Sequence, residues 1–70
     1  MDVIFITIGH RIAEKRKSLN LSQEKLAELT GFHRNYIGIV ERAERSANLQ
    51  TIIIIAKSLN MTLEELFKDL

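Results

Sequence analysis

The run LSQEKLAELTGFHRNYIGIVERAER, residues 21–45, contains two short helical patterns separated by a turn. Ser22 is a favourable N-cap for the SQEKLAEL segment, and we expect a helix over residues 22–29 with Leu26, Ala27 and Leu29 on its buried side. Gly31 follows, at a point where the end of a helix commonly needs a residue with positive φ. Helical spacing predicts a second helix over residues 33–42. The stretch therefore predicts two short helices joined by a turn that contains glycine.

This arrangement is the helix-turn-helix, whose second helix lies in the major groove of DNA and contacts base edges with its N-terminal residues. Arg34 and Asn35 occupy that N-terminal turn. Arginine can form two hydrogen bonds with guanine, and asparagine can do so with adenine. In the middle of the helix, Gly38 permits close approach to DNA and Ile39 can pack on a thymine methyl group. The pattern concentrates base reading at Arg34 and Asn35.

Helical spacing also dominates the residues before this stretch. An apolar stripe interrupted by one charged residue predicts a first helix over about residues 6–19. Residues 3–8, VIFITI, have a composition that would also suit a strand, so the start of this helix is its least defined boundary. The stripe consists of Phe5, Ile8, Ile12, Arg16 and Leu19.

Two further helices are expected over about residues 49–68. Asn48 can cap the segment LQTIIIIAKSLN, in which helical spacing outweighs the strand preference of consecutive isoleucines. Thr62 and Glu65 have the spacing of a capping box at the start of a short fifth helix. The residues expected to face inward are Leu49, Ile52, Ile55, Ala56 and Leu59, followed by Leu63, Leu66 and Phe67.

The whole chain has 70 residues, of which 46% are apolar and 27% charged, and its formal net charge is +1. This composition is typical of a globular protein, and the length suits a single domain over residues 1–70. A domain of this size buries only about 60% of the surface of its unfolded chain, so oligomerisation would help to stabilise it. The helical patterns predict an all-α fold, a compact bundle of five helices.

Several functional classes are disfavoured. The chain has no cysteine, its two histidines fall in different expected helices, and its three glycines do not form a phosphate-binding loop. We expect no enzyme activity, no catalytic residue, no metal ion, no cofactor and no small-molecule ligand. The VIFITI segment is too short for a signal peptide, and no apolar run approaches the roughly 18 residues of a membrane span. We therefore expect a soluble cytoplasmic protein without membrane contact.

Residues 21–45 resemble the helix-turn-helix of the Cro/phage-repressor (XRE) family, and the similarity extends over about residues 8–67. The ending IxxIAKSLNMTLEELF, in which x is any residue, is typical of helices four and five in that family. Within the family, HRNYIGIVERAERSANLQTI is most similar to controller proteins of restriction–modification systems. The resemblance implies a lambda-repressor-like domain that binds a palindromic operator in double-stranded DNA as a homodimer. Such a regulator represses a promoter by occupying it, or activates one by touching RNA polymerase.

The resemblance also assigns roles in DNA binding. Gln23 would touch a phosphate and brace the recognition helix, while Arg42 and Arg45 would contact phosphates, with the minor groove as an alternative for Arg45. Tyr36 either places its hydroxyl on a phosphate or packs on the core, and His33 is the expected N-cap. The alternative for Arg34 is a phosphate contact or a surface salt bridge, and for Asn35 a phosphate contact. For most of the other side chains it is an ordinary surface position. The predicted DNA-binding residues are Gln23, His33, Arg34, Asn35, Tyr36, Gly38, Ile39, Arg42 and Arg45.

The same resemblance gives Arg16 and Glu41 an architectural role. Arg16 lies on the apolar stripe of the first helix, and Glu41 lies at the inner end of the third. Matching positions in the family form a partly buried ion pair that links those helices with defined geometry.

Helix four carries more isoleucine than one buried stripe requires. Ile53 and Ile54 point away from the stripe at about 100° per residue, and exposed apolar side chains often mark an interface. The alternative is that one of them is half-buried by residues 3–8. The predicted dimer interface consists of Ile53, Ile54, Leu63 and Phe67.

The competing function is protein interaction. An antitoxin-type or other interaction module with this fold would bind its partner through helices four and five. RNA binding is less favoured because the chain lacks an aromatic platform for stacking bases. The discriminating feature is a set of polar side chains that an interaction module does not need, namely Gln23, Arg34, Arg42 and Arg45.

Overall fold

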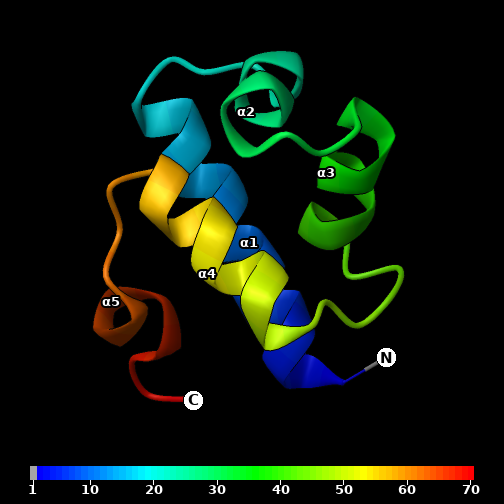
Figure 1. Ribbon diagram of the computed structural model, residues 1–70. Coiled ribbons are helices and arrows are strands. Elements are labelled where there is room, and N and C mark those ends of the chain that lie inside the picture. Colours follow the sequence, from blue (N-terminus) through cyan, green and yellow to red (C-terminus); the bar gives the residue numbers. More distant parts are fainter. Residues whose placement is uncertain (1) are drawn as a thin grey trace.

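Five helices form over residues 2–70, the part of the chain that the computed structural model describes (Figure 1). No strand is found among these residues, so the predicted all-α bundle of five helices is confirmed. The predicted single domain of residues 1–70 also includes Met1, which lies outside the described residues. The helices are α1 (Val3–Ser18), α2 (Gln23–Thr30), α3 (Arg34–Glu41), α4 (Leu49–Ser58) and α5 (Leu63–Phe67).

A side chain caps the start of each helix. In every case the residue before the helix accepts a hydrogen bond from a backbone N–H of the first turn, which would otherwise have no partner in the helix. Thr62 and Glu65 satisfy each other in both directions as a capping box. The cap at Asp2 was not predicted. The caps predicted from the sequence are all present, at Ser22, His33, Asn48 and Thr62.

Helix α1 begins at Val3, earlier than the predicted start near residue 6. Asp2 Oδ1 accepts a hydrogen bond from the backbone N–H of Ile4 at 2.9 Å, which fixes the first turn. Ile8, within the VIFITI segment, is 4% exposed and belongs to the core. A cap and burial on a helical stripe thus outweigh the strand-like composition of residues 3–8.

Four leucines that were predicted to be buried lie on the surface, and two of them, Leu49 at 59% and Leu63 at 38% exposed, belong to α4 and α5. Leu19 is 44% exposed and Leu29 is 51% exposed. Leu19 is the C-cap of α1, so the helical stripe ends before it. Leu29 follows the buried Ala27 by two residues, which turns it about 200° around the helix axis. The buried side of α2 is therefore only Leu26 and Ala27.

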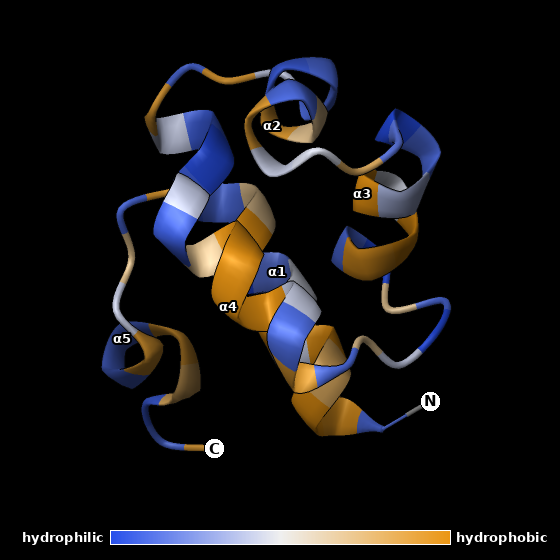
Figure 2. Ribbon diagram, viewed as in Figure 1, coloured by the Kyte–Doolittle hydropathy of each residue, from blue (hydrophilic) through white to orange (hydrophobic). Residues whose placement is uncertain are grey.

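The core takes side chains from all five helices. Ile12, Leu26, Ile37, Ile55 and Leu66, one from each helix, are completely buried. Figure 2 shows the middle of α4 as a continuous hydrophobic segment. The consecutive isoleucines of α4 remain helical because burial in the bundle outweighs their intrinsic preference for strands.

Helices α1 and α3 come close together at Gly9, a position for which no role was predicted. A Cβ atom at Gly9 would lie 2.5 Å from the carbonyl oxygen of Glu41 and 2.7 Å from that of Val40. Both are backbone atoms of α3, which cannot rotate aside as a side chain can. The absence of a side chain at Gly9 therefore lets the C-terminal end of α3 rest on α1.

Helices α2 and α3 lie beside each other, at the top and right of Figure 1, whereas α5 and the first turn of α1 lie toward the bottom. The inner side of α3 packs on the rest of the bundle through Ile37 and Val40. The other side of α3 faces away from the remaining helices. This arrangement leaves the first turn of α3 exposed.

Candidate nucleic-acid interface

The turn between α2 and α3 sets the angle between these helices. Gly31 adopts φ 80°, and its backbone N–H donates to the carbonyl oxygen of Ala27 at 2.9 Å. Thr30 Oγ1 accepts a hydrogen bond from the backbone N–H of Phe32 at 3.2 Å. The Phe32 ring then meets the Tyr36 ring edge-on, with centroids 5.3 Å apart. These contacts hold the start of α3 in a fixed position next to α2.

Helix α3 separates an apolar side from a polar one. Ile37 is fully buried and Val40 is 5% exposed, whereas Arg34 and Asn35 are exposed. His33 Nδ1 accepts a hydrogen bond from the backbone N–H of Asn35 at 3.1 Å, so the imidazole caps the helix as predicted. The polar side chains of the first turn therefore project into solvent from a well-defined helix start.

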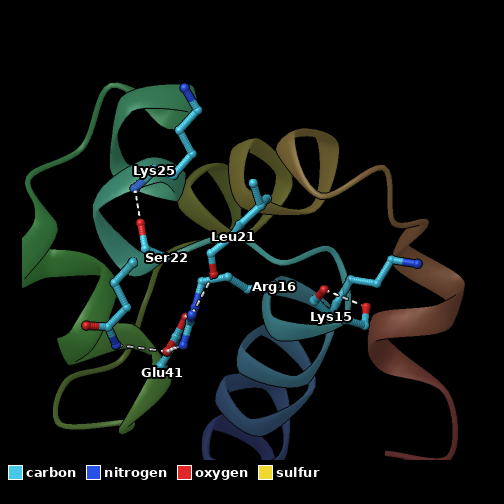
Figure 3. A network of polar contacts seen from close by, with 8 residues as sticks. Lys15, Arg16, Leu21, Ser22, Lys25 and Glu41 are labelled. Carbon is cyan, nitrogen blue, oxygen red and sulfur yellow. Dashed lines mark hydrogen bonds and ion pairs between the residues drawn. The ribbon is translucent and has the colours of Figure 1, made fainter.

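Arg16 and Glu41 form a buried ion pair between α1 and α3 (Figure 3). Arg16 Nε donates to Glu41 Oε2 at 2.7 Å, and Arg16 Nη2 donates to Glu41 Oε1 at 3.1 Å. Arg16 Nη1 donates to the carbonyl oxygen of Leu21 at 2.8 Å. The two charged residues are 8% and 7% exposed. All three guanidinium nitrogens are used, as the burial of an arginine requires.

Gln23 joins this network from the first turn of α2. Its Nε2 donates to Glu41 Oε1 at 3.0 Å, so the side chain links α2 directly to the end of α3. This contact is the bracing part of the role that the family resemblance implies. The amide nitrogen carries a second N–H, and this geometry is compatible with an additional bond to a phosphate.

Tyr36 connects α3 to α4. Its hydroxyl lies 3.3 Å from Thr51 Oγ1, and its half-buried ring packs against Phe32. Of the two roles that the sequence left open for Tyr36, this geometry favours packing on the core over a phosphate contact.

A groove follows the exposed side of α3. Most of the predicted DNA-binding residues line it together, whereas His33, Tyr36 and Arg45 do not. A neighbouring hollow at the start of α2 shares Gln23 and Arg34 with it. The residues that line the groove are Gln23, Arg34, Asn35, Gly38, Ile39, Arg42 and Glu44.

Two carboxylates belong to this surface, and neither was predicted to have a role there. Glu44 Oε2 lies 2.7 Å from Arg42 Nε, and Glu24 Oε2 lies 3.8 Å from Arg34 Nη1. The hydrogen bond from Arg42 lowers the pKa of the Glu44 carboxyl, and the same bond raises the pKa of Arg42. The spacing of Arg42 and Glu44 in the sequence suggests proximity, but the direction of side chains beyond a helix end depends on the fold.

The predicted dimer residues are only partly available at the surface. Ile53, Ile54 and Phe67 are half-buried, and Leu63 is 38% exposed. A group of exposed apolar side chains lies instead in the first turns of α1 and α4 and at the C-terminal end; its members are Val3, Leu49, Leu70 and Ile4. We call the depression beside them the apolar hollow. It is lined by Ile4, Phe5, Ile8, Ala47, Leu49, Ile52, Phe67 and Leu70.

Across residues 2–70, no group of histidine and carboxylate side chains could hold a metal ion, and no helix is long and apolar enough to cross a membrane. The groove instead presents amide, guanidinium and carboxylate groups. These are the groups with which proteins contact phosphates and base edges.

Comparisons of the sequence and of the structure with known proteins all find helix-turn-helix or controller proteins. A family model described as helix-turn-helix matches residues 12–66. The chain is 49% identical over 69 residues to Control protein C.SmaI of Serratia marcescens, covering 93% of this chain and 82% of that protein. It is 38% identical over 64 residues to Control protein C.BamHI of Bacillus amyloliquefaciens, covering 90% of this chain and 79% of that protein. The crystal structure of the restriction-modification controller protein C.AhdI from Aeromonas hydrophila matches with a TM-score of 0.88 and 39% identity, covering 94% of this chain and all (100%) of that one.

Proposed function

The chain belongs to the helix-turn-helix family, and from this membership we propose that it is a sequence-specific DNA-binding regulator of transcription whose recognition helix is α3. One observation carries the proposal. The first turn of α3 exposes Arg34 and Asn35 at a groove, while the buried pair of Arg16 and Glu41 and the amide of Gln23 hold the helix in place. A rigid helix with polar side chains at its exposed start is suited to the major groove.

Within this function, Arg34 reads a guanine and Asn35 an adenine through paired hydrogen bonds in the major groove. Gln23 donates its second amide N–H to a phosphate of the DNA backbone. Arg45, on the exposed loop after α3, contacts a phosphate or enters the adjacent minor groove. These phosphate contacts make the affinity fall as salt concentration rises.

The similarity to controller proteins supports a homodimer that binds a palindromic operator and regulates a restriction–modification system in the cytoplasm. The two copies of α3 would then enter successive major grooves about 34 Å apart. The predicted interface of Ile53, Ile54, Leu63 and Phe67 borders the apolar hollow, which shares Phe67. Repression follows from occupation of a promoter, and activation requires contact with RNA polymerase beside the operator.

Titration of the protein against a labelled duplex from the promoter upstream of its own gene tests this function. Fluorescence anisotropy at several salt concentrations should show saturable binding that weakens as salt rises, and unlabelled duplex of scrambled sequence should compete poorly. Binding that is equal for promoter and scrambled duplexes would contradict a sequence-specific regulator.

Arg34→Ala is the sharpest variant for this assay. The loss of a paired contact with guanine should weaken binding to the promoter duplex by about 1–3 kcal/mol and relax the preference at one base pair of each half-site. Lys57→Ala, which removes an equal charge from an exposed position on α4, is the matched control and should keep the preference. An unchanged preference in Arg34→Ala would remove Arg34 from the base-reading residues.

The apolar hollow supports a second candidate, a module that binds another protein. Exposed apolar surface marks interaction sites generally and does not by itself distinguish a second copy of the chain from a different partner. Mass measurement of the pure protein separates the two. A dimeric mass would favour self-association, which substitutions in the hollow can then locate, whereas a monomeric protein that does not bind promoter DNA would favour the interaction module.

A further inference from the structure

The middle of the recognition helix is occupied by a side chain that starts one turn later. A Cβ atom at Gly38 would lie 2.8 Å from Arg42 Nη1, 3.2 Å from Nη2 and 3.3 Å from Cζ. The guanidinium of Arg42 therefore fills the space that a side chain of residue 38 would take, and it covers Gly38 so that this residue is buried. The centre of α3 lacks a side chain of its own but carries a cation.

Glu44 holds the guanidinium in this place. Arg42 Nε donates to Glu44 Oε2 at 2.7 Å, and Nη2 donates to Oε1 at 3.5 Å. This pair uses one edge of the guanidinium, and the edge between Nη1 and Nη2 remains for another acceptor. That second edge has the forked geometry that matches guanine O6 and N7 or two phosphate oxygens.

The same space lies on the reading side of the helix. Residues four apart share one face of a helix, so Gly38 lies one turn below Arg34 on that face. Arg34, Gly38 and Arg42 line one groove together with Asn35. If the Arg42 side chain pointed away from α3, as a contact to the DNA backbone alone would allow, it would not cover Gly38.

We propose that Arg42 is a base-reading residue, placed at the centre of the recognition surface by the Glu44 carboxylate and by the missing side chain of Gly38. This inference rests on the proposed function, because it assumes that α3 enters the major groove. It assigns to Arg42 a third specific contact per half-site, besides those of Arg34 and Asn35, made at the level of Gly38 one helical turn from Arg34. Glu44 and Gly38 are positioning residues, since neither needs to touch a base.

Selection of binding sites from a pool of duplexes with a randomised centre, followed by sequencing, tests the assignment on any operator sequence. Wild-type protein should enrich a palindromic sequence. Arg42→Lys keeps the charge and loses the fork, Gly38→Ala displaces the guanidinium, and Glu44→Ala removes its anchor. Each of the three variants should lower the preference for one base over the others by about 5- to 150-fold, at the base pair of each half-site that Arg42 contacts. Arg34→Lys should act at a different base pair.

Two controls separate positioning from general effects. Glu28→Ala removes an exposed carboxylate of α2 that lies 3.7 Å from Lys25 outside the groove, and the enriched sequence should not change. Gly38→Ala retains every charge, so the dependence of its affinity on salt should match that of wild type. Circular dichroism checks that each variant is folded before selection.

The outcomes are distinct. If Gly38→Ala and Glu44→Ala retain the wild-type profile at every position, the inference is overturned while the proposed function stands. If Arg42→Lys weakens binding to all sequences equally, Arg42 is a phosphate contact and the inference is likewise overturned. If wild-type protein enriches no sequence at all, the proposed function fails and the inference fails with it.

Discussion

Gly9 lets the backbones of α1 and α3 touch, and its replacement by a larger residue should destabilise the folded protein. In Gly9→Ala the new methyl group would press on the carbonyl oxygens of Val40 and Glu41, neither of which can move alone. We expect a loss of about 2–3 kcal/mol in the free energy of unfolding, because overpacking a buried contact that forces the backbone to shift costs up to about 3 kcal/mol. Urea unfolding followed by circular dichroism measures this loss.

Gly38→Ala is the matched control, because its new methyl group meets only the end of the flexible Arg42 side chain. Alanine is about 1 kcal/mol better than glycine inside a helix, so this variant should be as stable as wild type or slightly more stable. Equal losses for the two alanine variants would show that the contact at Gly9 is not tight in solution.

Glu41→Gln should destabilise the protein strongly. The substitution leaves the Arg16 guanidinium buried without its counter-charge, which costs on the order of 3–5 kcal/mol. Urea unfolding again measures the change. Glu28→Gln, in an exposed pair whose side chains are 55% and 64% exposed, should change stability little. A Glu41→Gln variant with near wild-type stability would mean that the ion pair is open to water.

For single residues, the sequence predicted the roles that follow from the type of side chain and from its position in a helix. The cap at His33 and the exposed pair of Arg34 and Asn35 are where helical spacing places them. The roles of Gly9 and Glu44 were not predictable. Gly9 faces backbone atoms of α3, which is distant in sequence, and Glu44 contacts the Arg42 side chain beyond the end of α3. A glycine in a helix does not reveal from sequence what it lies against.

Helix α5 depends on its capping box, and this makes its stability sensitive to acid. Glu65 accepts hydrogen bonds from the backbone N–H of Thr62 at 3.0 Å and from the Thr62 hydroxyl at 3.1 Å. These bonds lower the pKa of Glu65 below its ordinary value of 4.5. Because the folded pKa is the lower one, the ionised carboxylate stabilises the fold above pH 4.5, and this contribution disappears as pH falls through the folded pKa.

The difference in unfolding free energy between wild type and Glu65→Gln should therefore be constant at neutral pH and narrow as the pH drops below 4.5. Urea unfolding at a series of pH values measures it. Glu64→Gln removes a neighbouring exposed carboxylate outside the capping box and serves as the control. If the difference in unfolding free energy between wild type and Glu65→Gln stayed the same throughout the acid range, the capping box would not be formed in solution.

Helix positions were largely predictable because each helix has apolar residues at helical spacing and four of the five have a cap that the sequence reveals. The start of α1 was missed because one acidic residue, Asp2, decides it against the composition of the six residues that follow. Leu19 and Leu29 were misplaced because a stripe drawn on an ideal helix does not show where the neighbouring helices stop.

The apolar hollow gives the whole molecule a surface that should associate. Leu49→Glu introduces a charge at a residue that is 59% exposed on this surface, and we expect it to weaken the proposed dimer, so that the variant has a lower mass than wild type at the same concentration. Light scattering after size-exclusion chromatography measures the mass. Leu29→Glu, at an exposed leucine of α2 that is 51% accessible, is the matched control and should leave the mass unchanged.

The predicted interface is tested in the same experiment. Leu63→Glu should shift the mass as Leu49→Glu does if the interface extends from the hollow along α5. A dimer that survives Leu49→Glu but not Leu63→Glu would restrict the interface to the residues predicted from the sequence. Survival of the dimer in both variants would place the association elsewhere.

At the scale of the molecule, family membership and the number of helices were predicted correctly, since they follow from motifs that are continuous in sequence. The groove could be anticipated only in part, because Gln23 reaches it from α2 and Glu44 from the loop after α3. The apolar hollow was not predicted. It combines α1, α4, α5 and the C-terminal end, and which apolar side chains remain uncovered depends on how these parts pack.

The network of Arg16, Glu41 and Gln23 also bears on how such a protein can evolve. These three side chains satisfy one another, so an inherited change in one of them has to be matched by the others. Arg34 and Asn35 are less constrained, because they project from the helix into solvent and the contact of Arg34 with Glu24 is exposed. A lineage can therefore acquire a new target sequence by mutating the exposed turn of α3 while the inherited scaffold stays as it is.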